Sequence, residues 1–286
     1  MDFMVIELKA RRLADDFIFL EGLKWHDGQV WASDVFDNCV YAISPEGSRR
    51  KVCDVPTRPS GLGFLPDGTL IIASAKDRRL LRLDGDRTSQ YADLSNHAPA
   101  YVNDFVVDAK GRIFVGDFGY DIDAGEPPKP TCLLRVDPDG AISEAAAGVE
   151  FPNGAAIINQ GRTLVLAETW VGRLTAFDLN DRGELSNRRL FADMGGRQPD
   201  GICADAEGAI WAGCFNTGEF VRVEDGGNFT HRLKFDGSGI TCTLGGANGS
   251  QLFLSTYLGP PEDIGTGLRK GNLFVVDVDV PAIGAI

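Results

Sequence analysis

The stretch PDGICADAEGAIWAGCFNTGEFVRVE, residues 199–224, contains the pattern that decides the fold. At its centre lies a two-residue turn, Glu207-Gly208, with a short apolar run on each side and a third such run at 219–224. A glycine turn between short apolar runs is a strong signal for a β-hairpin, because glycine readily adopts the positive φ that these turns need. We therefore expect residues 199–224 to fold as a small antiparallel meander.

The same pattern recurs six times along the chain, at intervals of roughly 40–50 residues, the period typical of propeller blades. We therefore predict an all-β fold, a six-bladed β-propeller, in which residues 1–286 form a single domain. Two separate β-sandwiches are the alternative, which the even spacing and the lack of a linker-like Pro/Ser stretch disfavour. The six turns are Asp27-Gly28, Asp67-Gly68, Lys110-Gly111, Gln160-Gly161, Glu207-Gly208 and Asn248-Gly249.

Two segments fall outside the repeat. The opening segment MVIELKARRL, residues 4–13, has strand character but belongs to no complete unit. We expect this N-terminal strand to add the outer strand of the last blade, which closes the ring and removes an exposed sheet edge. The segment GYDIDAGEPPKP, residues 119–130, is too polar and proline-rich for a strand, so we predict a long loop inserted in the third blade.

Composition excludes several classes of partner. The net charge is −13 and the Lys/Arg clusters are short, which argues against nucleic acid and against an anionic membrane surface. No apolar run approaches the roughly 20 residues that span a bilayer, and the N-terminus does not resemble a signal peptide. The six cysteines are scattered without a CxxC pair, which favours reduced thiols and a cytoplasmic location, with a Cys203–Cys214 disulfide as the alternative. The pattern carries no signal for oligomeric state.

One oxygen-bearing residue begins the first strand of each unit. In a propeller the innermost strands line the central channel, so these residues should converge near the axis on one face. Two carboxylates and two carboxamides meeting there are costly without a cation, and a set without Cys or His favours Ca²⁺, Mg²⁺ or Mn²⁺, with Zn²⁺ also open. The six residues are Glu21, Ser60, Asn103, Asn153, Asp200 and Thr241.

An ordinary turn is the competing interpretation of these positions, because Asn-Gly and Asp-Gly are common turn dipeptides. Glu21-Gly22 does not fit that interpretation, since Glu favours neither turns nor strands. The recurrence at matching positions of several units supports the convergent site.

At these residues the chain resembles the SMP-30/gluconolactonase/LRE family, which includes regucalcin-like six-bladed lactonases. The resemblance runs from Phe19 to about Tyr257 and is carried by short motifs in a fixed order. The motifs are Leu20-Glu21-Gly22 with Trp25, Asn103-Asp104, Phe151-Pro152-Asn153-Gly154, Pro199-Asp200-Gly201, and Thr241-Cys242 with Gly245-Gly246.

The resemblance implies a metal-dependent lactonase, a carboxylic ester hydrolase that opens a cyclic ester with one divalent metal ion. Ca²⁺ is the expected ion, with Zn²⁺, Mg²⁺, Mn²⁺ and Fe²⁺ as alternatives. Glu21, Asn153 and Asp200 would bind the metal, and Asn103 would be a fourth ligand or a substrate contact. Asp200 is the implied general base, Asp104 is a second candidate for that role, and Asn103 would assist catalysis.

The chain departs from the family's sugar lactonases in the third blade. Those enzymes carry Arg two residues before the blade-three Asn, where this chain has Tyr101, and they carry polar residues where it has Phe118 and Tyr120. An aromatic wall favours a flatter, less hydroxylated substrate. We expect Tyr101, Asn103, Phe118, Tyr120 and His97 to contact a small-molecule lactone; alternatively, the aromatic residues only pack the loop and His97 is solvated.

Other functions remain open on the sequence alone. The same metal site could act on another ester, such as an organophosphate, or in an isomerisation. A non-enzymatic propeller scaffold is the alternative of a different class. A serine hydrolase is disfavoured because no GxSxG motif is present.

Overall fold

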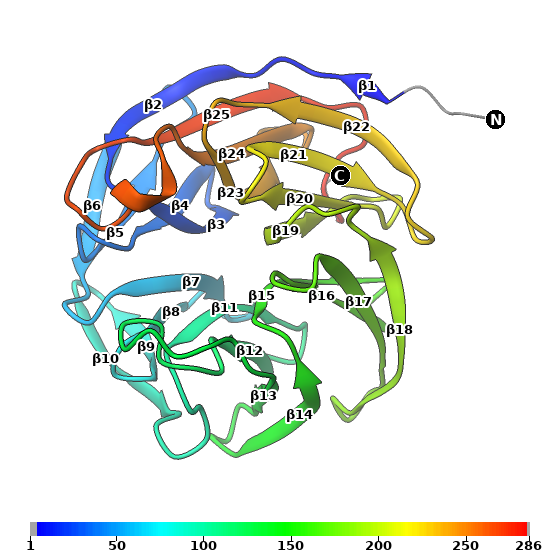
Figure 1. Ribbon diagram of the computed structural model, residues 1–286. Coiled ribbons are helices and arrows are strands. Elements are labelled where there is room, and N and C mark those ends of the chain that lie inside the picture. Colours follow the sequence, from blue (N-terminus) through cyan, green and yellow to red (C-terminus); the bar gives the residue numbers. More distant parts are fainter. Residues whose placement is uncertain (1–4, 285–286) are drawn as a thin grey trace.

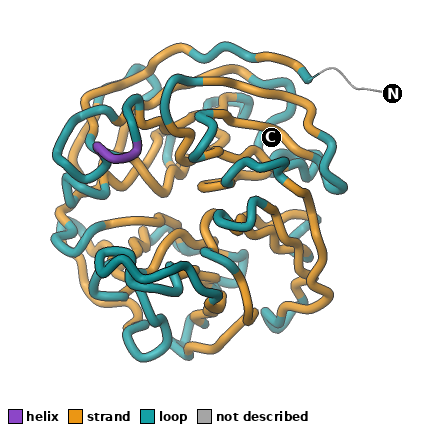
Figure 2. The backbone as a smooth tube through the Cα atoms, in the orientation of Figure 1, coloured by secondary structure: helices purple, strands orange, loops and turns teal. Residues whose placement is uncertain are grey.

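Six β-sheets, five of them wholly antiparallel, surround a common axis in the computed structural model, which describes residues 5–284 (Figures 1 and 2). Each innermost strand packs against the next, and the sixth packs against the first, so the ring is closed. The predicted all-β, six-bladed propeller is confirmed. Among the described residues, helix is confined to one 3-10 turn, η1 (Pro261–Asp263), and no helix there has the length and apolar character to cross a membrane.

Each blade runs from its innermost strand outward in chain order. The first is β3 (Leu20–His26), β4 (Gln29–Asp34), β5 (Cys39–Ile43) and β6 (Arg49–Asp54); the second is β7 (Pro59–Phe64), β8 (Leu70–Ser74), β9 (Arg79–Asp84) and β10 (Arg87–Asp93). The third is β11 (Val102–Val107), β12 (Ile113–Asp117), β13 (Thr131–Val136) and β14 (Ile142–Val149); the fourth is β15 (Pro152–Ile158), β16 (Thr163–Glu168), β17 (Arg173–Leu179) and β18 (Leu185–Asp193). The fifth is β19 (Pro199–Ala204), β20 (Ile210–Cys214), β21 (Glu219–Val223), β22 (Phe229–Lys234) and β1 (Ile6–Glu7); the sixth is β23 (Ser238–Gly245), β24 (Gln251–Tyr257), β25 (Gly271–Asp277) and β2 (Arg11–Phe17).

The start of the chain contributes to two blades. Strand β2 pairs antiparallel with β25, so N-terminal residues form the outer strand of the sixth blade. Strand β1 instead pairs in parallel with β22 of the fifth blade, where Glu7 forms an ion pair with Arg232 at 2.6 Å. The segment predicted as one strand, residues 4–13, is therefore divided between neighbouring blades, and its Met4 lies outside the described residues.

The core lies between neighbouring sheets, and the middle strands supply both sides of it. In β8, Ile71 and Ala73 pack toward the third blade, whereas Leu70 and Ile72 pack toward the first. Successive side chains of a strand point to opposite faces, so a strand buried on both faces needs a continuous apolar run. This is why each repeat contains such a run after its turn glycine.

Close packing at the axis explains the glycines that follow the inward-facing polar residues. A Cβ added at Gly154 would lie 2.4 Å from the backbone nitrogen of Ile202, and one added at Gly61 would lie 2.5 Å from Asp104 Oδ1. The innermost strands of adjacent blades approach too closely for a side chain there. The Asn-Gly and Asp-Gly pairs at strand starts thus allow adjacent blades to pack closely at the axis and do not form turns.

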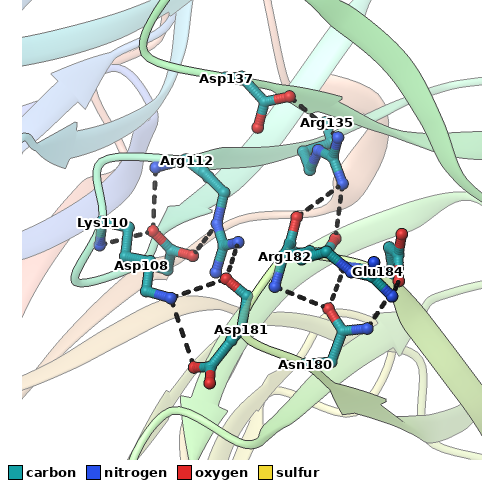
Figure 3. A network of polar contacts seen from close by, with 10 residues as sticks. Asp108, Lys110, Arg112, Arg135, Asp137, Asn180, Asp181, Arg182 and Glu184 are labelled. Atoms are coloured by element: carbon teal, nitrogen blue, oxygen red, sulfur yellow. Dashed lines mark hydrogen bonds and ion pairs between the residues drawn. The ribbon is translucent and has the colours of Figure 1, made fainter.

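A polar network ties the third blade to the fourth (Figure 3). The buried Arg112 donates Nε to Asp108 Oδ2 at 2.5 Å and Nη1 to the carbonyl oxygen of Asp181 at 2.9 Å. Arg135 Nη1 donates to the carbonyl oxygen of Gly183 at 3.0 Å. Asp108 follows the last residue of β11, so this network lies at the opposite end of that strand from Asn103.

The predicted blade-three insertion is confirmed, since residues 118–130 join β12 to β13 without a strand. The six cysteines are free, so the Cys203–Cys214 disulfide is wrong. Cys203 Sγ lies instead 3.6 Å from Cys242 Sγ in the neighbouring blade.

Candidate functional site

Five inward-facing polar residues from five blades line one cavity of about 420 Å³. Each is the second residue of its innermost strand, where the strand bulges before regular pairing begins. A bulge turns a side chain away from the pleat, and here it directs polar groups to the axis. The residues are Glu21, Ser60, Asn103, Asn153 and Asp200.

The sixth expected position, Thr241, does not join them. It is the fourth residue of β23, and its side chain packs against Gly201 of the fifth blade. The bulge in β23 falls between Gly239 and Thr241 and contains Ile240, which is buried with Phe19 and Tyr257. The sixth blade therefore presents an apolar residue at this level of the ring.

Hydrogen bonds orient the two carboxamides. Asn103 Nδ2 donates to the carbonyl oxygen of Pro152 at 3.2 Å, and Ser60 Oγ donates to Asn103 Oδ1 at 3.4 Å. Asn153 Nδ2 donates to Thr169 Oγ1 at 3.3 Å, and Thr169 in turn donates to the carbonyl oxygen of Pro199 at 2.8 Å. Asn153 Oδ1 is buried and has no hydrogen-bond partner among the described residues.

Both carboxyl groups at the cavity resist ionisation. Burial, and then the charge of Asp104, raises the pKa of Asp200 to about 8. Burial also raises the pKa of Glu21 well above its ordinary value, and the nearby charges of Asp200 and Asp104 add to the rise. Neither carboxyl group forms an ion pair with a described Lys, Arg or His side chain. Two desolvated acids close together are stable as carboxylates only beside a cation.

These side chains fit a hard divalent cation. The unpartnered Asn153 oxygen and the two uncompensated carboxyl groups are oxygen donors of the kind that Ca²⁺ and Mg²⁺ prefer. Within residues 5–284, no three His, Cys, Asp or Glu side chains are grouped to hold a metal. A metal at this cavity would therefore need carboxamide oxygens as well as carboxylates, which Asn153 and Asn103 can supply.

Aromatic rings form the wall of the cavity on the side of blades three and four. The Phe118 and Phe151 rings stack with centroids 4.7 Å apart, Phe151 and Trp170 are 4.8 Å apart, and Tyr101 lies 5.9 Å from Phe118. All four residues line the cavity. Phe151 has a φ of 49°, an uncommon conformation for a bulky residue and one that occurs at binding sites.

Three residues considered as site residues do not line the cavity. Tyr120 lies behind the wall and accepts a hydrogen bond from Trp170 Nε1 at 2.9 Å, so it supports the wall. His97 is exposed, as the solvated-loop alternative expects. Asp104 is buried against the second blade, and its carboxylate accepts a hydrogen bond from the backbone nitrogen of Phe105 at 2.8 Å.

Several cavity residues were missed by the sequence interpretation, chief among them Arg58, Phe151, Trp170 and Phe36. Two of them share a signal, because Arg58 and Phe151 each precede a Pro that is followed by an axial polar residue. Trp170 and Phe36 lie in connections after second strands, where no repeat pattern identifies them.

Proteins of one family resemble this chain in sequence and in structure. The sequence model of a family described as "SMP-30/Gluconolactonase/LRE-like region" matches residues 19–257. Pentonolactonase XacC from Haloferax volcanii is 26% identical over 271 residues, covering 90% of each protein. A solved structure described as a calcium-binding protein, regucalcin, from Agrobacterium tumefaciens superposes with a TM-score of 0.81 at 22% identity, over 98% of this chain and 97% of that one. A solved putative gluconolactonase gives a TM-score of 0.80 at 24% identity, over 96% of this chain and 93% of that one.

Proposed function

The chain belongs to the SMP-30/gluconolactonase/LRE-like family, and from that premise we propose that it is a metal-dependent lactonase. The observation that carries the proposal is the pair of desolvated carboxyl groups, Glu21 and Asp200, that have no ion-pair partner and share one cavity with an unpartnered carboxamide oxygen. The relative named as a pentonolactonase supports the reaction class.

A bound divalent cation would polarise the lactone carbonyl and stabilise the oxyanion that develops on its oxygen. Glu21, Asn153 and Asp200 would hold the cation, with Asn103 as a fourth ligand or as a contact to the substrate. Ca²⁺ is the proposed ion, supported by the all-oxygen donor set and by the relative described as calcium-binding.

The protein's own groups supply position and proton transfer. Asp200 lines the cavity beside the proposed ion and is the proposed acceptor of a proton from the attacking water. It would return this proton to the ring oxygen that leaves when the C–O bond of the lactone breaks. Asn103 is held by Pro152 and Ser60, so it can orient a substrate without losing side-chain freedom on binding. The aromatic wall would exclude bulk water from the ester.

The substrate we propose is flatter and less hydroxylated than a sugar lactone. Hydroxyl groups need polar partners when buried, and the wall formed by Tyr101, Phe118, Phe151 and Trp170 is largely apolar. The Tyr101 hydroxyl is already engaged, since it donates to Asp123 Oδ2 at 2.8 Å.

A panel of lactones tests the proposal, with ring opening followed by acid release in the presence of several divalent ions. Asp200→Ala should lower kcat/KM by about 10²–10⁴-fold, the usual loss for a general base, while leaving the fold intact by circular dichroism. Asp27→Asn is the matched control, since Asp27 is 85% exposed in a hairpin turn. Undiminished turnover in Asp200→Ala would remove the proposal, and a protein with neither metal nor lactonase activity would favour a scaffold role.

The proposed location is the cytoplasm, supported by six free thiols. The proposed partner is the small-molecule lactone alone, since the net charge of −13 disfavours nucleic acid and anionic membranes.

A further inference from the structure

Arg58 brings a guanidinium group with open hydrogen-bond donors to the cavity. It lines the same cavity as Glu21 and Asp200. Its backbone carbonyl accepts a hydrogen bond from the backbone nitrogen of Ala75 at 2.8 Å, but its guanidinium donates none to any residue within 5–284. Its guanidinium lies over the Phe36 ring, 5.0 Å from the ring centroid, and its side chain is 29% exposed. An arginine presents five donors in a planar fork, and none of the donors of Arg58 is engaged in a hydrogen bond to a described residue.

The backbone directs this side chain inward. Arg58 has a φ of 65°, in the left-handed region that non-glycine residues rarely occupy. Phe151 occupies the same place before its own Pro and axial polar residue, with a φ of 49°, and its ring also lines the cavity. Strained positions of this kind persist where the surrounding structure over-determines them, and they cluster at ligand-binding sites.

The charges around Arg58 do not cancel. Asp123 is its nearest carboxylate, at 3.8 Å, but Asp123 Oδ2 already accepts hydrogen bonds from Lys76 Nζ at 3.1 Å and from the Tyr101 hydroxyl at 2.8 Å. Two cationic side chains thus face one carboxylate at the rim, in a chain whose net charge is −13. The contact of Arg58 with Asp123 is too long for a hydrogen bond, so the guanidinium fork can still bind a carboxylate through two parallel hydrogen bonds.

We propose that the cavity takes a lactone that carries a carboxylate on an apolar body, and that Arg58 binds this carboxylate and so determines specificity. The inference rests on the proposed function, because the lactone ring must reach the axial carboxyl groups while the body lies along the aromatic wall. Arg58 touches the substrate far from the reacting ester, so its contribution is to recognition.

The test compares two lactones that differ only in charge: 3,4-dihydrocoumarin and its derivative with a carboxylate on the aromatic ring. The wild-type protein should favour the carboxylated lactone by at least tenfold in kcat/KM, and Arg58→Gln should lower this ratio by at least tenfold. Arg82→Gln, which changes an arginine paired with Asp84 on the outer part of the second blade, is the matched control and should keep the ratio. A wild-type ratio near one, or an equal ratio in Arg58→Gln and wild type, overturns the inference.

A binding measurement separates this inference from the reaction itself. Calorimetry in Ca²⁺-containing buffer compares the ring-opened hydroxy acids, with and without the extra carboxylate, on wild type and Arg58→Gln. A preference of at least tenfold that disappears in Arg58→Gln supports the role of Arg58 even if neither lactone is hydrolysed, in which case only the proposed reaction fails. Hydrolysis of both lactones with no preference in rate or binding overturns the role of Arg58 and leaves the proposed lactonase standing.

Discussion

Asn153 and Asp200 each bring to the cavity a polar group that the protein itself does not satisfy. The Asn153 amide nitrogen is engaged by Thr169, which leaves its oxygen buried and unpartnered. The Asp200 carboxyl group is desolvated and lies near the charge of Asp104. Buried polar groups without partners cost free energy, so their presence together is best explained by a ligand that completes them.

Replacing Asn153 by Ala should weaken Ca²⁺ binding by about tenfold or more, because the cation loses one oxygen while the carboxyl groups remain. Isothermal titration calorimetry measures the change. Asn248→Ala, at an exposed turn, is the control and should bind Ca²⁺ as wild type does. Unchanged affinity in Asn153→Ala would remove this residue from the ligand set.

The raised pKa of Asp200 predicts a pH dependence of metal binding. Without a cation this carboxyl group stays protonated up to about pH 8, so binding below that pH must release a proton. Apparent Ca²⁺ affinity should therefore rise by about tenfold or more per unit between pH 6 and pH 8, because the pKa of Glu21, the second carboxyl ligand, is also raised. An affinity that is flat across this range would contradict the account.

The raised pKa of Asp200 also makes the stability of the metal-free protein depend on pH. The unfolded chain releases the Asp200 proton near the ordinary value of 3.8 and the folded chain releases it near 8, so stability falls as pH rises between these values. Thermal melts in a chelating buffer should show this decline in wild type and a smaller one in Asp200→Asn.

The sequence predicts the axial residues better than the residues of the aromatic wall. The repeat predicts the axial residues, because its period places one residue of each innermost strand at the same height along the axis. These residues are Glu21, Asn103, Asn153 and Asp200. Phe118 and Tyr120, by contrast, lie in the loop, and Gly119 between them has a φ of 77° that reverses the local course of the chain. Alternation of side chains does not survive such a turn, so one ring enters the cavity and the other supports it from behind.

At the scale of elements, the loop of residues 118–130 covers one side of the cavity, and its outer part, residues 121–130, contacts the neighbouring blades through Asp123. Its Asp123 reaches back to Tyr101, which precedes β11, and to Lys76 of the second blade. Ile122 and Asp123 both line the cavity. Residues 121–130 are proline-rich and exposed, so few other contacts define the position of this part of the loop.

Asp123→Ala should loosen this loop and raise KM more than it changes kcat, because the wall is displaced while the axial groups stay in place. Limited proteolysis should cut the variant faster within residues 121–129 than it cuts wild type. Lys129→Ala, which removes only an exposed ion pair with Glu126, should behave like wild type. Equal cleavage rates and equal KM in Asp123→Ala would show that Asp123 does not anchor this part of the loop.

At the scale of the whole molecule, closure of the ring depends on residues from the two ends of the chain. Strand β2 covers the edge of β25 and contributes Phe17, which is fully buried against Leu273 and Phe253. Strand β1 adds only two paired residues to the outside of the fifth blade. The two segments should therefore differ greatly in importance.

Removal of residues 1–17 should leave the edge of β25 open and expose apolar core, giving aggregation or a large loss of thermal stability. Removal of residues 1–8 should lower Tm by only a few degrees, since it deletes β1 and leaves the sixth blade complete. Solubility and thermal melts of the two truncated proteins provide the comparison. Similar behaviour of both would contradict the assigned closure.

The fold as a whole was accessible from the sequence because a propeller repeats one simple unit. Turn glycines such as Gly68 and Gly208, followed by apolar runs, mark the hairpin of each blade without any long-range information. The position of Thr241 was not accessible, because the bulge in β23 encloses Ile240 and the register of a bulge depends on neighbouring strands. The neighbouring strands that set this register come together only in the assembled ring, so the sequence pattern of one blade does not predict it.

Anomalous diffraction from crystals soaked with Mn²⁺ or Ca²⁺ tests the central claim most directly, namely that residues from separate blades share one cation. We expect a single strong peak on the axis, with oxygens of Glu21, Asn153 and Asp200 about 2.0–2.6 Å from it. A map with no peak in this cavity, or with a peak bound only by residues elsewhere, would contradict it.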